Sequence, residues 1–85
     1  EFALSAPSPN PASGTAEVRF ALPAPSPVRL VVVDALGREV ARLADGERAA
    51  GWHAAALDTR RLAAGTYVVR LVASEGVLTR VLTVV

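Results

Sequence analysis

Short segments of alternating hydrophobicity, separated by turn-forming residues, run through almost the whole of this chain of 85 residues. In segment 17–22, for example, the apolar side chains of Val18, Phe20 and Leu22 alternate with those of polar or small residues. A period of two is typical of a strand that buries one face. Six or seven such segments follow one another, with turn signals every ~8–12 positions. This spacing favours a β-sandwich or a barrel over a fold built on helices.

The turns between these segments have recognisable chemistry. In the turn at 35–38, Gly37 is expected to supply a positive φ, and Asp34 can hydrogen-bond forward onto free backbone N–H groups. Asp45-Gly46-Glu47 is predicted to form a second turn. A crossing at 58–65, with Leu62 as its apolar plug, and a hairpin turn at 74–76 are also expected. The predicted strands therefore cover residues 17–22, 28–34, 39–44, 51–57, 66–74 and 77–85.

Two of the predicted strands allow a more specific expectation. In the second strand, Val31 and Val33 add apolar side chains to the face opposite Leu30, which indicates a central position in its sheet. In the third strand, Val40 and Leu43 are expected to point into the core.

A proline-rich lead-in precedes the first strand. Proline at positions 7, 9 and 11 fixes φ and pushes each preceding residue into extended geometry. The sequence therefore predicts a stiff strap over residues 1–14, which Phe2 and Leu4 could anchor by apolar contact. We expect residues 15–85 to form the sandwich and residues 1–85 to form a single domain.

Composition excludes several classes of protein. The nine basic residues are all Arg, they are interspersed with acidic residues, and the net charge is +1, so the basic face typical of nucleic-acid binding is missing. Apolar runs are far shorter than the ~20 residues of a membrane-spanning helix, and the start of the chain does not read as a signal peptide. Cysteine is absent, which excludes a disulfide scaffold and thiol chemistry.

No residue pattern indicates an enzyme. His53 is the sole histidine, so neither a protein zinc site nor a base for an activated serine is expected. Asp58 with Arg60-Arg61 is best explained as a loop salt bridge or as solvated charge. Trp52 could stack on a sugar, although such platforms usually combine several aromatic residues. We therefore expect no catalytic, cofactor-binding or metal-binding residues and no cofactor.

The turns and strands occur in a fixed order that resembles one known family. A Pro-Asn-Pro strap is followed by Val-Asp-Ala-Leu-Gly-Arg-Glu-Val, then by Leu-Ala-Ala-Gly-Thr-Tyr and a closing strand. This order is similar to that of the type A C-terminal sorting domain of the type IX (Por) secretion system, over essentially the whole chain. The matching positions are Phe2, Leu4, Pro9, Asn10, Pro11, Leu22, Pro23, Val28, Leu30, Val32, Asp34, Gly37, Arg38, Val40, Gly51, His53, Leu62, Gly65, Tyr67, Leu71 and Arg80.

The resemblance implies an immunoglobulin-like antiparallel β-sandwich of about seven strands, at the end of a larger exported protein. Such domains are recognised in the periplasm and direct passage through an outer-membrane secretion translocon. Sortase-type machinery often removes them as the cargo is attached to surface lipopolysaccharide, while others are retained as cell-attachment modules. The implied partners are therefore this machinery and the N-terminal cargo domains of the parent protein. The implied location is the cell surface or the extracellular space.

Within this hypothesis, an exposed last strand can pair with a partner by strand addition, and Arg80 guards that strand against promiscuous pairing. Two other functions stay open. One is a carbohydrate-binding accessory module of a secreted glycoside hydrolase; the other is a structural immunoglobulin-like spacer, similar to a domain of flagellar hook-capping proteins. The residues expected to carry recognition by the secretion machinery are Pro9, Asn10, Pro11, Asp34, Gly37, Arg38, Gly65, Tyr67 and Arg80.

Overall fold

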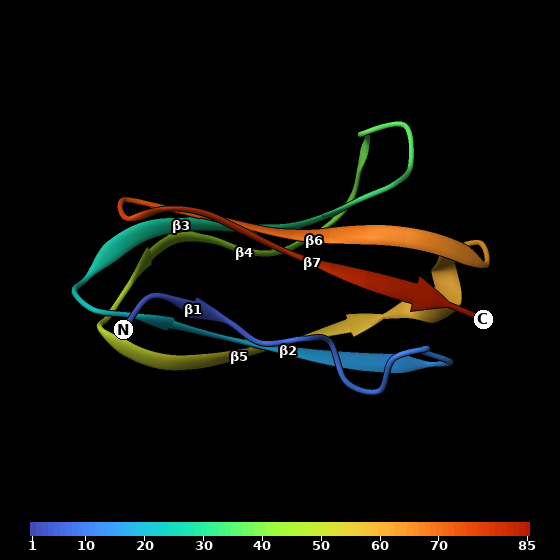
Figure 1. Ribbon diagram of the computed structural model, residues 1–85, viewed down its shortest axis with the longest axis horizontal. Helices are drawn as coiled ribbons and strands as arrows, with labels where there is room; N and C mark the ends of the chain where they lie inside the picture. Colours follow the sequence, from blue (N-terminus) through green and yellow to red (C-terminus); the bar gives the residue numbers. More distant parts are fainter.

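The computed structural model describes residues 1–85 and consists of two antiparallel β-sheets packed face to face (Figure 1). One sheet has three strands in the order β1-β2-β5, and the other has four in the order β4-β3-β6-β7. A single 3₁₀ turn at Thr59–Arg61 follows β5. The strands are β1 (Ala3–Leu4), β2 (Thr15–Leu22), β3 (Ser26–Val33), β4 (Glu39–Arg48), β5 (Gly51–Asp58), β6 (Gly65–Ala73) and β7 (Gly76–Val84). The predicted all-β sandwich is confirmed.

The strand order is that of an immunoglobulin-like sandwich with one change. Immunoglobulin constant domains place strands A, B, E and D in one sheet and C, F and G in the other. Here β1, β2 and β5 occupy the positions of A, B and E, whereas β3, β6 and β7 occupy those of C, F and G. The fourth strand, β4, pairs with β3 instead of β5. The second sheet therefore has four strands and the first has three.

Inward-facing side chains of both sheets form one core, which is almost entirely aliphatic. Buried and exposed positions alternate along β2 and β6, as a period of two requires. Phe20 is the largest fully buried side chain. The core consists of Leu4, Ala12, Ala16, Val18, Phe20, Leu22, Val28, Leu30, Val32, Ala44, Leu57, Tyr67, Val69, Leu71, Leu82 and Val84.

Strand β3 has the central position that its sequence predicts. It lies between β4 and β6, and both of its faces are buried from Leu30 to Val33. On the outer face, Val31 is 1% exposed although no further layer covers the sheet. Its cross-strand neighbours are Arg42 and Arg70, whose long apolar stems lie on the same outer face.

Strand β4 departs from the prediction because it carries two bulges. The register between β3 and β4 shifts twice, and Val40 and Leu43 are the residues without a direct partner on β3. Val40 is 37% exposed, so the expectation that it points into the core is wrong. Leu43 is half-buried and packs against the core.

The turn predicted at Asp45-Gly46-Glu47 is also wrong, since β4 continues through these residues to Arg48. Gly46 lies directly opposite Val28 in the register of the two strands. Because β3 begins before Val28, its first backbone groups need partners, and pairing with β4 supplies them. This tertiary pairing overrides the local turn preference. The connection to β5 is made by Ala49-Ala50 instead.

The proline-rich segment lies along the open side of the sandwich and changes sheets. Its strand β1 pairs with β2, whereas Ala12 forms a parallel bridge with Val84 of β7. Leu4 and Ala12 are both core residues. Residues 1–14 thus link the edge of the three-stranded sheet to the edge of the four-stranded sheet.

The molecule is elongated, with principal extents of 35 × 23 × 16 Å. The two ends of the chain lie at opposite ends of the long axis (Figure 1). The Asp34–Arg38 turn, the start of β6 and the end of β7 share the end that carries the C-terminus. None of the structure's helical residues forms a segment long and apolar enough to cross a membrane.

Candidate recognition end of the sandwich

Asp34 organises the turn between β3 and β4 with both oxygens of its carboxylate. Oδ1 accepts hydrogen bonds from the backbone N–H groups of Leu36 and Arg38, each at 2.9 Å. Oδ2 accepts from Nε of Arg38, also at 2.9 Å. These bonds confirm the expectation that Asp34 bonds forward along the chain. Because the N–H of Arg38, followed by its guanidinium, stabilises the ionised form, the pKa of Asp34 lies below its ordinary value.

Main-chain bonds complete the same turn. The N–H of Asp34 donates to the carbonyl of Arg38 at 2.9 Å, and the N–H of Gly37 donates to the carbonyl of Asp34 at 3.0 Å. Gly37 has φ of +81°, a value that L-residues with a side chain rarely adopt. The turn therefore has one well-defined conformation, and the positive φ predicted at Gly37 is confirmed.

Tyr67 fixes the loop that leads into β6. Its side chain is 8% exposed and belongs to the core, and its hydroxyl donates to the carbonyl of Ala63 at 2.6 Å. A tyrosine near the start of strand F that bonds back to the upstream backbone is the tyrosine corner of immunoglobulin-like domains. Tyr67 thus holds the Ala63–Gly65 loop in position, and little of it is available for contact with a partner.

The Asp34–Arg38 turn and the start of β6 come together around one shallow hollow of about 230 Å³. Pairing between β3 and β6, with Val33 opposite Val68, brings the two segments side by side. Of the residues that the sequence singles out, Asp34, Arg38, Gly65 and Tyr67 line this hollow. The other lining residues, which the sequence analysis missed, are Ala35, Leu36, Ala64 and Thr66.

The Pro9-Asn10-Pro11 segment lies against the end of β7. Proline has no N–H, so the backbone of this segment cannot form an ordinary ladder. The side-chain amide of Asn10 takes the place of a backbone peptide group: Nδ2 donates to the carbonyl of Val81 at 3.1 Å, and Oδ1 accepts from the N–H of Thr83 at 3.0 Å. Asn10 between two prolines therefore joins the strap to β7.

Ala12 continues this pairing, so the strap covers one half of the β7 edge. Its N–H donates to the carbonyl of Thr83 at 2.7 Å, and its carbonyl accepts from the N–H of Val85 at 3.0 Å. Alternation in an antiparallel pair also turns the backbone groups of Val77 and Thr79 away from β6. No strand lies beyond them, so the first half of β7 is an open edge.

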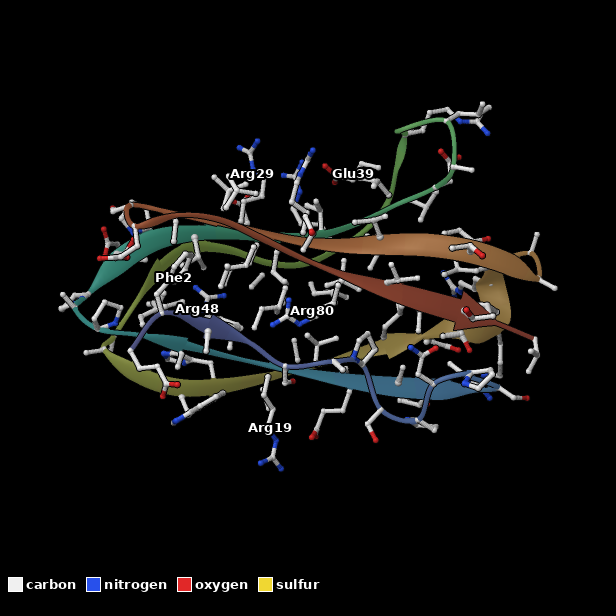
Figure 2. The ribbon with its side chains drawn as sticks, viewed as in Figure 1. Phe2, Arg19, Arg29, Glu39, Arg48 and Arg80 are labelled. Carbon is white, nitrogen blue, oxygen red and sulfur yellow. The ribbon has the colours of Figure 1, made fainter.

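Arg80 lies in the open half of β7 and does not line the hollow. It is opposite the buried residue Val69, and cross-strand partners share a face. Figure 2 accordingly shows Arg80 pointing into the space between the two sheets, whereas Arg29 and Arg19 point away from the sandwich. Nη1 of Arg80 donates to the carbonyl of Thr79 at 2.9 Å.

The candidate residues thus divide into two groups. Gly65 and Ala12 flank Val84 on its two sides, so the hollow and the Asn10 strap lie at the same end of the molecule. Arg80 stands apart, near the middle of the sandwich (Figure 2).

The remaining polar and aromatic candidates have structural environments of their own. Asp58 accepts hydrogen bonds from Nε of Arg60 at 2.9 Å and from its backbone N–H at 3.0 Å, as the predicted loop salt bridge requires. Donation by the Arg60 guanidinium lowers the pKa of Asp58 to about 2. His53 is half-buried, its ring stacks on Phe20 with 5.1 Å between centroids, and no cluster of potential metal ligands is present. Trp52 is exposed on the outer face of the three-stranded sheet.

The fold places the protein in the class of immunoglobulin-like β-sandwich modules, a class that carries many unrelated functions. The family model of the secretion system C-terminal sorting domain matches residues 8–85. The chain therefore belongs to this family, the C-terminal sorting domains of the type IX secretion system. Comparison with curated proteins and with solved structures gives no match. The family acts as a signal for sorting by type IX secretion, which implies export to the cell surface or the extracellular space.

Proposed function

We propose that this domain directs a cargo protein, joined before residue 1, through the periplasm and the outer-membrane translocon, and then serves in attachment to the cell surface. The observation that carries the proposal is the grouping of Asp34, Arg38, Gly65 and Tyr67 around one hollow. Membership of the sorting-domain family supports recognition by type IX machinery. The domain itself contributes shape and performs no reaction.

The hydrogen bonds of the candidate residues indicate which of them maintain the recognised surface and which of them contact the partner. Asp34 and Tyr67 use their polar atoms within the domain, so we assign them the role of holding the recognised surface in shape. Arg38 and the main chain at Gly65 are exposed and face the partner in this proposal. Asn10 keeps the strap on β7, which leaves the end of the molecule with a fixed outline.

The open half of the β7 edge offers a second kind of contact. The N–H and C=O groups of Val77 and the N–H group of Thr79 match those of an extended peptide, which could add as a further strand, whereas the C=O of Thr79 already accepts a hydrogen bond from Arg80. Arg80 limits such pairing, because an inward-pointing charge on an edge strand opposes coverage by another sheet. In this proposal the translocon or the sortase-type machinery supplies the added strand.

A reporter fusion tests the function directly. Residues 1–85 are joined to the C-terminus of a periplasm-stable reporter in a host with a working type IX system, and the same fusion is made in a translocon-deficient strain. We expect the reporter on the cell surface or in the medium of the first host and in the periplasm of the second. Protease treatment of intact cells separates surface attachment from release. Retention of the reporter in the periplasm of both hosts would indicate a structural spacer and refute the proposal.

A further inference from the structure

Leu36, at the tip of the Asp34–Arg38 turn, is 77% exposed, a larger fraction than any other large apolar side chain of the chain. A single exposed leucine needs no explanation by itself. This one differs in three respects: its conformation, its place in the molecule and its charged neighbour. Together they indicate what it contacts.

The first respect is that the turn fixes the position of Leu36. Its own backbone N–H donates to Oδ1 of Asp34 at 2.9 Å, and the next residue, Gly37, bonds back to the carbonyl of Asp34 at 3.0 Å. A side chain on a preformed turn loses little backbone entropy when it binds. The backbone of Leu36 is thus held in one conformation before any partner binds.

The second respect is that the turn stands away from the body of the protein. A bulge between Val32 and Val33 of β3 and the facing residues of β4 displaces the end of this hairpin. Figure 1 shows the β3–β4 connection rising out of the four-stranded sheet. Leu36 can therefore enter a concave surface before the rest of the sandwich meets it.

The third respect is the guanidinium of Arg38, which is oriented but only partly used. Its Nε is bonded to Oδ2 of Asp34, which fixes the plane of the group, while its side chain is 72% exposed. Neither terminal nitrogen has a hydrogen-bond partner in the protein. The free fork of an arginine matches a carboxylate, which can accept two parallel bonds.

We propose that the Asp34–Arg38 turn is a two-point plug: Leu36 enters an apolar pocket of a secretion-machinery protein, and the terminal nitrogens of Arg38 pair with a carboxylate at the rim of that pocket. The inference rests on the proposed sorting function and deepens it by stating the chemistry of the partner surface. Charge complementarity with Arg38 requires an acidic rim, and the shape of an isolated leucine requires a narrow apolar cavity. Asp34 is a positioning residue in this arrangement.

Variants of the reporter fusion test the plug in the host with a working type IX system. Leu36→Asp places a charge in the apolar pocket, and we expect the exported fraction to fall ~10-fold or more. Leu36→Met keeps size and apolarity, and we expect export within about twofold of the original. Trp52→Ala is the matched control, because it removes a large apolar side chain that is 58% exposed but lies on the other sheet. We expect this variant to be exported as well as the original. Arg38→Lys keeps the charge but loses the fork, and we expect an intermediate loss.

The outcomes separate the two proposals. If the original fusion is exported and Leu36→Asp is exported equally well, the plug is refuted while the sorting function stands. If the original fusion is not exported, both fail. Circular dichroism and thermal melting of the purified variants should match the original, because Leu36 is exposed and outside the core. A photo-crosslinking residue at position 36 should yield an adduct with a secretion protein, which position 52 should not. An adduct with lipid or with a second copy of the domain would contradict the proposal.

Discussion

At the scale of single residues, two of the residues expected to carry recognition, Tyr67 and Asp34, use their polar atoms for bonds within the domain. Tyr67 is 8% exposed, and its hydroxyl serves the loop before β6. Asp34 uses both carboxylate oxygens within its own turn. Their effect on a partner is therefore indirect, through the shape of the loops that they hold.

Tyr67→Phe measures what the corner bond contributes. The substitution keeps the ring in the core and leaves the carbonyl of Ala63 without its 2.6 Å partner. We expect a loss of about 1 kcal/mol in the free energy of unfolding. In a domain of this size that loss corresponds to a melting temperature lower by about 4–8 °C. Equal melting temperatures for the two proteins would show that the bond contributes nothing to stability.

The lowered pKa of Asp58 leads us to expect that the stability of the domain depends on pH in the acidic range. Its pKa is lowered from 3.8 to about 2 in the folded state, chiefly by the side chain of Arg60, so folding favours the ionised carboxylate. This stabilisation is fully present above about pH 4 and is lost as the pH falls through about 2. Both side chains are exposed, so the effect is modest and screened by salt.

Asp58→Asn isolates this contribution, since asparagine can still accept the backbone hydrogen bond of Arg60. We expect the melting temperature of the variant to fall less steeply than that of the original between about pH 4 and pH 2 at low ionic strength. Parallel melting curves across this range would contradict the assignment.

Local chemistry predicts the Asp34–Gly37 turn well, because the bonds of the carboxylate and the positive φ depend on neighbouring residues alone. The role of Asn10 does not follow from local chemistry. Its partners, Val81 and Thr83, lie more than 70 positions along the chain, and only the folded arrangement shows that its amide replaces a peptide group.

At the scale of elements, the proline-rich strap of residues 1–14 is unusual because it pairs with a strand without an ordinary backbone ladder. Prolines that cannot donate hydrogen bonds alternate with residues that do, and the strap still pairs with β7 through Asn10 and Ala12. It thereby acts as a partial edge strand for the four-stranded sheet. The strap also protects the last residues of β7 from pairing with other chains.

Asn10→Ala should loosen the strap without unfolding the sandwich. The change leaves the carbonyl of Val81 and the N–H of Thr83 without their partner. We expect hydrogen exchange at the Thr83 amide to accelerate by ~10-fold, because a lost hydrogen bond of about 1–1.5 kcal/mol corresponds to that factor. Exchange at Val69 in the centre of β6 should not change.

Ser13→Ala is the control for this measurement, since Ser13 is an exposed strap residue whose side chain forms no hydrogen bond within the protein. Exchange at Thr83 should be the same in this variant as in the original. Unchanged exchange at Thr83 in Asn10→Ala would show that the side-chain amide does not hold the strap.

The strands themselves are predictable where a single sheet face decides the pattern. Alternation identifies β2 and β6, and the two-sided apolar pattern identifies β3 as central. Strand β4 is not predictable in the same way, because Val40 and Leu43 are bulge residues. Each bulge moves the later side chains to the other face, so a regular period of two assigns them wrongly.

At the scale of the whole molecule, the small core leaves little reserve of stability. A domain of 85 residues has a free energy of unfolding of about 4–13 kcal/mol. Phe20 is the largest fully buried side chain, and truncation of a buried Phe to Ala typically costs ~3–5 kcal/mol. One substitution in the core can therefore decide whether the domain is folded.

Phe20→Ala and Phe20→Leu test whether sorting needs the folded domain. We expect Phe20→Ala to be largely unfolded in urea titrations at concentrations that the original withstands, and its reporter fusion to stay in the cell. Phe20→Leu, which retains most of the buried volume, should fold and be exported. Normal export of a demonstrably unfolded Phe20→Ala fusion would show that a linear sequence is recognised instead of a surface.

This result also bears on truncation experiments. Deleting the last ten residues would remove the whole of β7, and with it the core residues Leu82 and Val84. A failure of export would then report unfolding as much as loss of a recognised strand. Point substitutions at exposed positions such as Leu36 separate these two causes.

The two chain ends lie at opposite ends of an axis of 35 Å (Figure 1). A passenger protein attached ahead of Glu1 is joined at the pole of the molecule remote from the Asp34–Arg38 turn, whatever its own size or shape. The point of attachment is therefore separated from the turn by the length of the domain. One adaptor of this geometry can accordingly serve passengers of unrelated shape, provided that each is joined at the same pole.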